Sequence, residues 1–418
     1  MSPGQSRTPY DGTPVDAPVD APVDAPVDAP VDAPVVAPQV AVVGGGQLAR
    51  MLAEPAAAMG VPLRLLAEAP GASAAQVIPD HVVGDYTDLA TLRDLVAGCR
   101  VITFDHEHVP SDHLHALEEA GVAVRPGPGA LVHAQDKVVM RDALAGLGAP
   151  VPRFRVVTDP EEVADFGLPC VLKTSRGGYD GKGVWFVGTP DECAPAFEVA
   201  AARGVSILAE ERVDFRRELS ALVARSPSGQ AAAYPVVESV QRDGICHEVV
   251  APAPGLPAHL ATQAQELALR IARELDVTGI LAVELFETVD GRILVNELAM
   301  RPHNTGHWTQ DGAVTSQFEN HLRAVLDLPL GSPVARSPWT VMVNILGGPA
   351  EVGGRLYDGY PHALARDPLL RVHLYGKEPR PGRKVGHVNA YGDDLQECRE
   401  RARHAAAWFA GELGDESE

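Results

Sequence analysis

Short apolar runs alternate with longer helical segments from residue 39 onward, and this alternation constrains the possible folds more than any other feature of the chain. Val40–Val43 reads as a buried strand, and Gln47–Met59 has the pattern of a helix. Alternating strands and helices assemble into a parallel sheet with helices on its faces. The sequence therefore predicts a parallel α/β domain, with further strands at residues 63–66, 101–104 and 122–124 and further helices at 88–97 and 113–120.

A different pattern, typical of an α+β fold, follows a predicted helix over residues 134–147. Two of its strands flank the turn Val289-Asp290-Gly291, which is typical of a β-hairpin. A smaller β-rich piece runs from about Trp339 to Tyr391, and residues 392–418 read as a helix with an acidic end. The strands expected in the α+β region are 153–157, 170–173, 184–187, 207–210, 219–224, 280–286 and 292–298.

The N-terminal segment contains a perfect PVDA repeat from Pro14 to Ala33. Proline at every fourth position blocks helix and sheet, and the repeated aspartates repel one another. We expect a disordered tail with polyproline character. The predicted organisation is a tail at 1–38, a parallel α/β domain at 39–133, an α+β domain at 134–335 with a lid at about 150–215, a β-rich C-terminal domain at 336–405 and an acidic tail at 406–418.

The composition argues against several classes of function. A formal net charge of −21 makes nucleic acid a poor partner, because binding to its phosphates needs a basic surface. No apolar run approaches the roughly 20 residues of a membrane helix, and the N-terminus lacks the pattern of a signal peptide. The five cysteines include no C-x-x-C pair, which argues against a zinc site or a disulfide framework. We expect a soluble, cytoplasmic protein that binds neither membranes nor nucleic acid.

The segment Gly44-Gly45-Gly46 lies between a predicted strand and a predicted helix. Glycine lets the backbone approach a ligand and a helix N-terminus favours anions, so a phosphate site is one interpretation. The segment does not match G-x-G-x-x-G, because Ala49 stands at the third glycine position. Glu68 is nevertheless placed as the ribose ligand of a dinucleotide-binding oxidoreductase would be. A tight turn without a ligand is the other interpretation.

A lysine that ends a predicted strand opens the glycine-rich stretch KTSRGGYDGKG, from Lys173 to Gly183. The order of residues is not that of a Walker A loop. A flexible glycine-rich hairpin can instead fold over a triphosphate, with Lys173 and Lys182 supplying positive charge. The alternative is a solvated hairpin whose lysines are incidental.

Two carboxylates lie on the strands of the predicted hairpin, Glu284 on the first and Glu297, beside Asn296, on the second. Carboxylates on paired strands can face one another, and two that are buried close together repel unless a cation lies between them. Mg²⁺ binds few carboxylates and leaves positions for ATP phosphates. Glu284 and Glu297 are therefore candidate metal ligands. Apolar flanking residues argue against the alternative, two exposed glutamates on a polar face.

Polar clusters also follow the hairpin. Arg301 can hold a carboxylate or phosphate through two hydrogen bonds, and His303, next to Asn304, can shuttle a proton. The basic segment Tyr375–His387 suggests a phosphate monoester as ligand, although a solvated loop or a basic interface would look the same. Weaker candidates, for contacts with adenine and ribose, are the acidic residues Glu210, Glu211 and Glu218.

Taken together, these motifs resemble the ATP-grasp superfamily and, more narrowly, the N5-carboxyaminoimidazole ribonucleotide synthase family, over roughly residues 39–400. The resemblance implies an α/β and α+β fold: a Rossmann-like pre-ATP-grasp domain, an ATP-grasp domain with a glycine-rich lid and a small β-rich C-terminal domain. It is carried by GGGQLARM at 44–51, KTSRGGYDGKG at 173–183, NELAMRPHNTGHWT at 296–309 and GKEPRPGRKVGHV at 376–388.

The resemblance also implies roles for individual residues. Those implied to bind ATP are Lys137, Lys173, Gly178, Tyr179, Asp180, Gly181, Lys182, Gly183, Val184, Glu210, Glu211, Arg212, Val213, Glu218, Gln241, Asn296 and Glu297. Those implied to bind the aminoimidazole ribonucleotide are Gly46, Gln47, Leu48, Tyr179, Asp180, Lys182, Lys377, Arg383 and Lys384. The implied metal ligands are Glu284 and Glu297, and the implied catalytic residues are Arg301, His303, Asn304 and Lys377.

The reaction implied is carboxylation of 5-aminoimidazole ribonucleotide with ATP and bicarbonate, by way of carboxyphosphate, in purine biosynthesis. The family resemblance implies a homodimer that uses ATP and Mg²⁺, or Mn²⁺ in its place. The chain departs from the family pattern where it has Lys137 for a common arginine, Gln241 for a histidine of some members and Thr305 for a common serine. It also has Thr103–Glu107 where a more acidic Phe-Glu-Phe-Glu pattern is found.

Three other functions compete with this one. Another ATP-grasp ligase, such as formate-dependent glycinamide ribonucleotide transformylase, shares the ATP site but has a different acceptor; the segments RPHNTGHW and GRKVGH favour the carboxylase. A dinucleotide-binding oxidoreductase leaves Lys173–Gly183 and Asn296–Trp308 without a role. A non-catalytic ATP-binding regulator is disfavoured because both candidate metal carboxylates are present.

Overall fold

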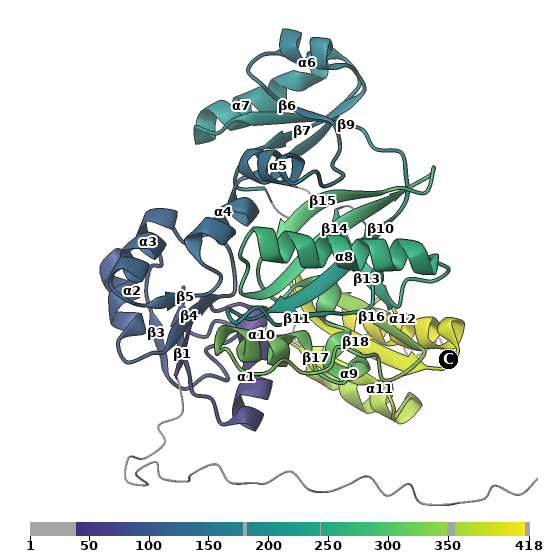
Figure 1. Cartoon of the computed structure of the whole chain (residues 1–418). Helices are drawn as coiled ribbons and strands as arrows, with labels where there is room; N and C mark the ends of the chain where they lie inside the picture. Colours follow the sequence, from purple (N-terminus) through teal and green to yellow (C-terminus); the bar gives the residue numbers. More distant parts are fainter. Residues whose placement is uncertain (1–38, 179–181, 243, 349–355, 414–418) are drawn as a thin grey trace, which may run out of the picture. The chain divides into compact units, whose positions relative to one another are not determined.

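The computed structural model describes residues 39–178, 182–242, 244–348 and 356–413. These residues form three β-sheets with helices packed on them (Figure 1). The predicted tail at 1–38 lies outside the described residues, as does the end of the acidic C-terminal tail. No described helix is both long enough and apolar enough to span a membrane.

The N-terminal sheet is parallel, with the strand order β3-β2-β1-β4-β5 among the described residues. Its central strand β1 is fully buried, as the apolar run predicted. The predicted parallel α/β domain is confirmed; only β3, an exposed strand of three residues, had no sequence signal. The elements are β1 (Val40–Val43), α1 (Gln47–Met59), β2 (Leu63–Ala67), β3 (His81–Val83), α2 (Leu89–Val96), β4 (Val101–Phe104), α3 (Ser111–Glu119) and β5 (Ala123–Val124).

Two helices replace the single helix predicted over residues 134–147. They are α4 (Pro128–Gln135) and α5 (Lys137–Gly146), separated by Asp136 in an extended conformation. The Asp136 carboxylate accepts hydrogen bonds from the backbone N–H groups of Val138 and Val139. Such an N-cap begins a new helix rather than continuing the old one, and it places Lys137 on the first turn of α5.

A small antiparallel sheet with the order β6-β9-β7-β8 follows. Helices α6 and α7 share a core of buried apolar side chains with its strands. This sheet occupies the region predicted as a lid. Its elements are β6 (Phe154–Val157), α6 (Pro160–Phe166), β7 (Cys170–Thr174), β8 (Val184–Val187), the 3-10 helix η1 (Pro190–Cys193), α7 (Ala194–Arg203) and β9 (Ile207–Glu211).

A large antiparallel sheet has the order β15-β14-β10-β12-β13-β16-β18-β17, with β11 paired to β10. The predicted hairpin joins β14 to β15. The sequence set the strands after Trp339 apart as a separate β-rich piece, but β16 pairs with β13, so they extend the same sheet. The strands are β10 (Phe215–Arg225), β11 (Ala231–Ala233), β12 (Val237–Arg242), β13 (Ile245–Ala251), β14 (Gly279–Thr288), β15 (Ile293–Ala299), β16 (Trp339–Leu346), β17 (Arg371–Leu374) and β18 (Lys384–Gly392).

Helices cover this sheet and tie it to the N-terminal one. The apolar side chains of α10 share a core with β1, β2 and α1, whereas α12 packs on β16 and β18. The remaining helical elements are α8 (Ala258–Glu274), η2 (Asn304–Gly306), α9 (Thr309–Gly312), α10 (Gln317–Val325), η3 (Leu356–Gly359), α11 (Tyr360–Arg366) and α12 (Leu395–Ala410).

A fully buried arginine joins α5 to the small and large sheets. Arg141 donates from Nε to Glu210 on β9 at 2.6 Å and from its Nη atoms to the carbonyls of Val295 and Asn296 on β15 at 3.3 and 2.7 Å. Lys173 lies on the other Glu210 oxygen, 2.7 Å away. Burial alone would raise the pKa of Glu210, but the charges and hydrogen bonds of Lys173 and Arg141 lower it to about 2.

This shift predicts how stability depends on pH. A carboxyl whose pKa is lower in the folded than in the unfolded protein stabilises the fold above its unfolded pKa of about 4.3 and loses that effect as pH falls towards the folded value. We expect Glu210→Gln to lower the free energy of unfolding by about 3 kcal/mol near pH 7. The difference from wild type should shrink as the pH falls from about 4.5 towards 2.

Urea unfolding of both proteins between pH 7 and 3 measures this difference. Glu198→Gln, an exposed change on α7, is the matched control and should stay within about 0.5 kcal/mol of wild type. A difference for Glu210→Gln that does not depend on pH would contradict the assignment.

Candidate active site

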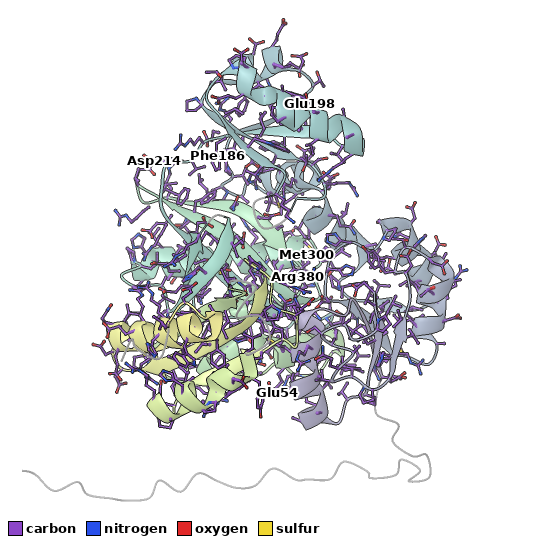
Figure 2. The ribbon with its side chains drawn as sticks, turned by 180° about the vertical axis from the view of Figure 1, so that it is seen from behind. Glu54, Phe186, Glu198, Asp214, Met300 and Arg380 are labelled. Carbon is purple, nitrogen blue, oxygen red and sulfur yellow. The ribbon has the colours of Figure 1, made fainter. Side chains whose placement is uncertain are left out.

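One cavity of about 1450 Å³ brings together the motifs that the sequence singled out. The small sheet, the large sheet and the carboxyl end of β4 all contribute to its walls. Phe186, labelled on the small sheet in Figure 2, lines it although 72% exposed. The predicted site residues that line the cavity are Gln47, Leu48, Lys137, Lys173, Gly178, Lys182, Val184, Glu210, Glu211, Arg212, Val213, Glu218, Gln241, Glu284, Asn296, Glu297, Arg301, His303, Asn304 and Lys384.

The glycine-rich loop connects β7 to β8, and its residues 175–178 and Lys182 line the cavity. Lys173, near the end of β7, reaches Asn296 Oδ1 on β15 at 3.3 Å as well as Glu210. Gly183 has φ +72°, and a Cβ there would come within 2.6 Å of Thr174 Oγ1, so only glycine fits this position. Tyr179, Asp180 and Gly181 lie outside the described residues, so their predicted contacts stay predictions.

Acidic side chains face the cavity from β9 and β10. The Glu210 carboxylate forms ion pairs with both Arg141 and Lys173, and it thereby positions Lys173. Glu218, on β10, has its pKa raised to about 7 by burial, an effect that Lys173 only partly offsets. Glu211, Arg212 and Val213, at and after the end of β9, line the cavity as predicted for an adenine-binding strand end.

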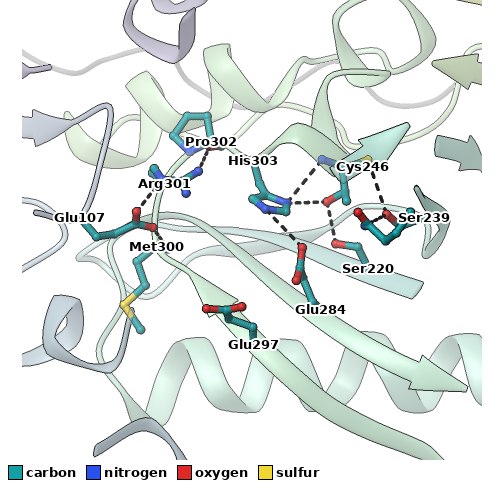
Figure 3. A network of polar contacts seen from close by, with 12 residues as sticks. Glu107, Ser220, Ser239, Cys246, Glu284, Glu297, Met300, Arg301, Pro302 and His303 are labelled. Carbon is teal, nitrogen blue, oxygen red and sulfur yellow. Dashed lines mark hydrogen bonds and ion pairs between the residues drawn. The ribbon is translucent and has the colours of Figure 1, made fainter. Parts of the chain in front are cut away.

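Glu284 and Glu297 stand directly opposite each other in the β14–β15 ladder, as Figure 3 shows. Burial and then repulsion by Glu297 raise the pKa of Glu284 to about 8. For Glu297, burial acts in the same direction, but the charge and hydrogen bond of Lys137, together with the charges of Lys173 and Arg141, outweigh it and lower the pKa. The two carboxylates therefore cannot both ionise easily without a further cation.

The donor set of this pair fits a hard divalent cation. Among the described residues, no group of three or more His, Cys, Asp and Glu side chains is arranged to hold a metal ion. Glu284 and Glu297 are the two carboxylates that would hold it, with Asn296 beside them. Mg²⁺ is commonly held by one or two carboxylates plus substrate phosphates. A softer metal such as zinc is not commonly held in this way.

The segment after β15 runs along the cavity next to this pair. His303 Nε2 lies 3.4 Å from Glu284 Oε1. Arg301 Nε donates to Glu107 Oε2 at 2.7 Å, and its Nη1 donates to the Pro302 carbonyl at 3.2 Å. Both polar atoms of the Asn304 side chain are buried without a hydrogen bond to any described residue. Such an amide is available to a polar ligand in the cavity.

The predicted phosphate-binding cations lie on or before β18. Lys384, the first residue of β18, lines the cavity. Lys377 donates to Gln47 Oε1, which ties it to the start of α1, and burial lowers its pKa. Arg383 is exposed and donates to the Glu378 carbonyl at 3.1 Å, outside the cavity lining. The structure thus brings Lys384 to the cavity, places Lys377 behind Gln47 and leaves Arg383 beside them on the surface.

In the β1–α1 turn, carboxylates accept hydrogen bonds from the backbone N–H groups that a bound phosphate would need. Gly45 N donates to Glu68 Oε2 at 2.9 Å, and Ala49 N donates to Asp105 Oδ1 at 2.8 Å. A Cβ on Gly46 would overlap Asp105, so this glycine makes room for an acid. Two carboxylates on these N–H groups would repel a pyrophosphate. The geometry therefore does not support the oxidoreductase interpretation, in which Glu68 would bind ribose.

The sequence left Glu107 doubtful as a site residue and gave no signal for Cys246. Glu107 lines the cavity, is nearly buried and holds Arg301, and its position after strand β4 is where ligand-binding residues gather in parallel sheets. Cys246, on β13, lines the cavity without any motif around it. Among the departures from the family pattern, Lys137 contacts Glu297, and Gln241 donates to Ser239 Oγ at 2.8 Å.

Three family models match consecutive parts of the chain. The ribonucleotide synthetase pre-ATP-grasp domain matches residues 38–135, the ATP-grasp domain matches 142–318, and the phosphoribosylaminoimidazole carboxylase C-terminal domain matches 340–401. Their order is the order that the motifs predicted. The pre-ATP-grasp match covers the parallel sheet, and the C-terminal match runs from the second residue of β16 through β18 into the first half of α12.

Individual proteins and solved structures are similar over most of the chain. The N5-carboxyaminoimidazole ribonucleotide synthase of Mycobacterium tuberculosis is 57% identical over 375 residues, 89% of this chain and 87% of that protein. The N5-carboxyaminoimidazole ribonucleotide synthetase structure from Thermus thermophilus has a TM-score of 0.79 at 38% identity, covering 90% of this chain and 99% of that one.

A fungal structure adds ligands to the comparison. The N5-carboxyaminoimidazole synthase of Aspergillus clavatus, solved in complex with ADP and 5-aminoimidazole ribonucleotide, has a TM-score of 0.81 at 31% identity and covers 89% of this chain and 98% of that one. Identity and coverage at these levels extend over the whole of the described fold. The chain therefore belongs to the N5-carboxyaminoimidazole ribonucleotide synthase family of the ATP-grasp superfamily.

Proposed function

We propose that this protein carboxylates 5-aminoimidazole ribonucleotide with ATP and bicarbonate, giving N5-carboxyaminoimidazole ribonucleotide, ADP and phosphate in purine biosynthesis. One observation carries the proposal: a single cavity combines the glycine-rich loop, the Glu284–Glu297 pair, the segment after β15 and Lys384. The relatives support it, since each carries this activity in its name and one was solved with ADP and the aminoimidazole ribonucleotide.

In the first step, a bicarbonate oxygen attacks the γ-phosphorus of ATP, the bond to the β-phosphate oxygen breaks, and carboxyphosphate and ADP form. Lys173 and Lys182 line the cavity and place positive charge beside the phosphates. Mg²⁺, or Mn²⁺ in its place, would be held by Glu284 and Glu297 and would neutralise phosphate charge. We assign the buried Asn304 amide to the bicarbonate as a hydrogen-bonding group.

In the second step, the substrate amine attacks the carboxyl carbon of carboxyphosphate, and the bond to the phosphate oxygen breaks. Arg301, held by Glu107, supplies a fixed positive charge for the developing anion. Burial and the charge of Arg301 lower the pKa of His303 to about 3, which makes this imidazole a weak base. We therefore assign the amine proton to the departing phosphate and a positioning role to His303.

Water must be kept away because it destroys carboxyphosphate. We assign the closing role to the β7–β8 loop, because Gly178 and Lys182 on either side of its tip line the cavity. At the other end of the cavity, Lys384, Gln47 and Leu48 would bind the ribonucleotide, with Lys377 behind Gln47 and Arg383 nearby. A homodimer in the cytoplasm completes the proposal, on the family resemblance alone; sedimentation analysis tests the dimer.

Release of ADP with matched substrate pairs tests the choice of acceptor. We expect turnover with bicarbonate plus 5-aminoimidazole ribonucleotide and none with formate plus glycinamide ribonucleotide. Turnover with the second pair alone would make the chain a transformylase. Tight ATP binding without turnover in either mixture would favour a regulator.

The metal assignment predicts the outcome of one substitution. Glu297→Gln keeps the shape of the side chain and removes the charge opposite Glu284. Because a metal ion contributes several kcal/mol of charge stabilisation, turnover should fall by about a hundredfold or more while the fold persists. Coupled ADP release measures the rate, and circular dichroism checks the fold. Glu198→Gln serves as the charge-matched control, and full activity in Glu297→Gln would refute the assignment.

The phosphate assignment predicts a change in KM. Lys384→Met removes the cation that lines the cavity at the start of β18. Loss of a charged hydrogen bond costs about 1.5–3 kcal/mol, so KM for the ribonucleotide should rise about 10–100-fold, with KM for ATP changed much less. Arg380→Met, on the same basic segment but exposed and paired with Glu378, is the control (Figure 2). Equal effects of the two variants would contradict the assignment.

A further inference from the structure

A chain of hydroxyl groups ends on the ring of His303. Ser220 Oγ lies 2.8 Å from Thr305 Oγ1, and Thr305 Oγ1 lies 2.8 Å from His303 Nδ1. The other ring nitrogen, Nε2, is 3.4 Å from Glu284 Oε1. Ser220 also stands directly opposite Glu284 in the β10–β14 ladder, so the chain begins and ends at neighbouring positions of one sheet face (Figure 3).

The backbone fixes the direction of every hydrogen bond in this chain. Thr305 N–H donates to His303 Nδ1 at 3.4 Å, so Nδ1 acts as an acceptor and carries no proton. The Thr305 hydroxyl must therefore donate its proton to Nδ1. Because that proton is then used, Thr305 Oγ1 accepts a hydrogen bond from the Ser220 hydroxyl. A neutral ring without a proton on Nδ1 carries it on Nε2, which faces Glu284.

The protein encloses both hydroxyls that support the ring. Ser220 and Thr305 are each 1% exposed, so water does not compete for their hydroxyls. No other hydrogen bond of either hydroxyl to a described residue interrupts the chain.

We propose that Thr305 and Ser220 are positioning residues: their hydroxyls hold His303 as the Nε2–H tautomer, so that the ring donates to Glu284 and orients this carboxylate for the divalent cation. Hydrogen bonds to the carboxylates around a metal commonly change metal affinity or activity 10–100-fold. The tautomer does not depend on which substrate is carboxylated. Only the effect on turnover rests on the function proposed above.

Two substitutions at one position separate the hydroxyl from the bulk of the side chain. Thr305→Val keeps the shape and removes the hydroxyl, whereas Thr305→Ser keeps the hydroxyl. Titration with Mn²⁺ in the presence of ADP, followed by electron paramagnetic resonance of the free ion, measures metal affinity without turnover. We expect Thr305→Val to bind Mn²⁺ about 10–100-fold more weakly and Thr305→Ser to restore binding to within about threefold of wild type.

Kinetics give a second readout. Thr305→Val should lower kcat with little change in KM for the ribonucleotide, because the Ser220–Thr305–His303 hydrogen bonds act on Glu284 and not on Lys384. Thr340→Val is the matched control: Thr340 is a buried threonine on β16 whose hydroxyl has no hydrogen-bond partner among the described residues. It should leave Mn²⁺ binding and kcat unchanged. Equal Mn²⁺ affinity in Thr305→Val and Thr305→Ser would overturn the proposal.

The tautomer itself can be observed in the wild-type protein, which removes any dependence on whether a variant folds. Nitrogen-15 NMR of histidine-labelled protein distinguishes a protonated from an unprotonated ring nitrogen, and His303→Gln assigns the signals of His303. We expect a proton on Nε2 and none on Nδ1. A proton on Nδ1 would overturn the proposal even if the carboxylase activity is confirmed. Conversely, an Nε2–H ring in a protein without carboxylase activity would refute only the function.

Discussion

Two carboxylates, Glu284 and Glu297, face each other across the β14–β15 hairpin, and the rest of the site is arranged around their mutual repulsion. The strand register fixes the two residues as direct neighbours across the ladder. Lys137 offsets the charge of Glu297 and leaves the pKa of Glu284 at about 8. Two adjacent buried carboxylates destabilise a folded protein unless a cation binds between them. The pair therefore indicates a metal site rather than a contribution to stability.

The parts of the fold that hold this pair differ from the parts that act on substrates. Arg141 and Glu210 join α5 to two sheets and position Lys173, but they contribute no free charge to a ligand. Ser220 and Thr305 likewise act as supports, because their hydrogen bonds hold the ring of His303. The groups that we propose act on substrates come from other elements that line the cavity: the β7–β8 loop, Asn304 after β15, and Lys384 at the start of β18. Supporting residues thus surround the cavity whose lining includes Gly178 and Lys182 of the β7–β8 loop.

Local patterns predicted the elements well, and long-range contacts explain what they missed. The apolar run at Val40–Val43 and the hairpin turn at Asp290 are set by neighbours in sequence, and both were predicted correctly. Asp136 is a typical N-cap residue, but the predicted helix over residues 134–147 continued across it. Nothing local could reveal that β16 pairs with β13, or that Arg141, which reads as a surface helix residue, is fully buried. The site motifs were recognisable because their residues are consecutive, whereas Glu107 and Ser220 act from distant strands.

The central claim is that Glu284 and Glu297 share one divalent ion. Anomalous X-ray scattering from crystals grown with ADP and Mn²⁺ tests it most directly, because the signal locates the metal without reference to activity. We expect one strong manganese peak between the two carboxylates, next to the ADP phosphates. A peak elsewhere in the cavity, with none between Glu284 and Glu297, would contradict this account.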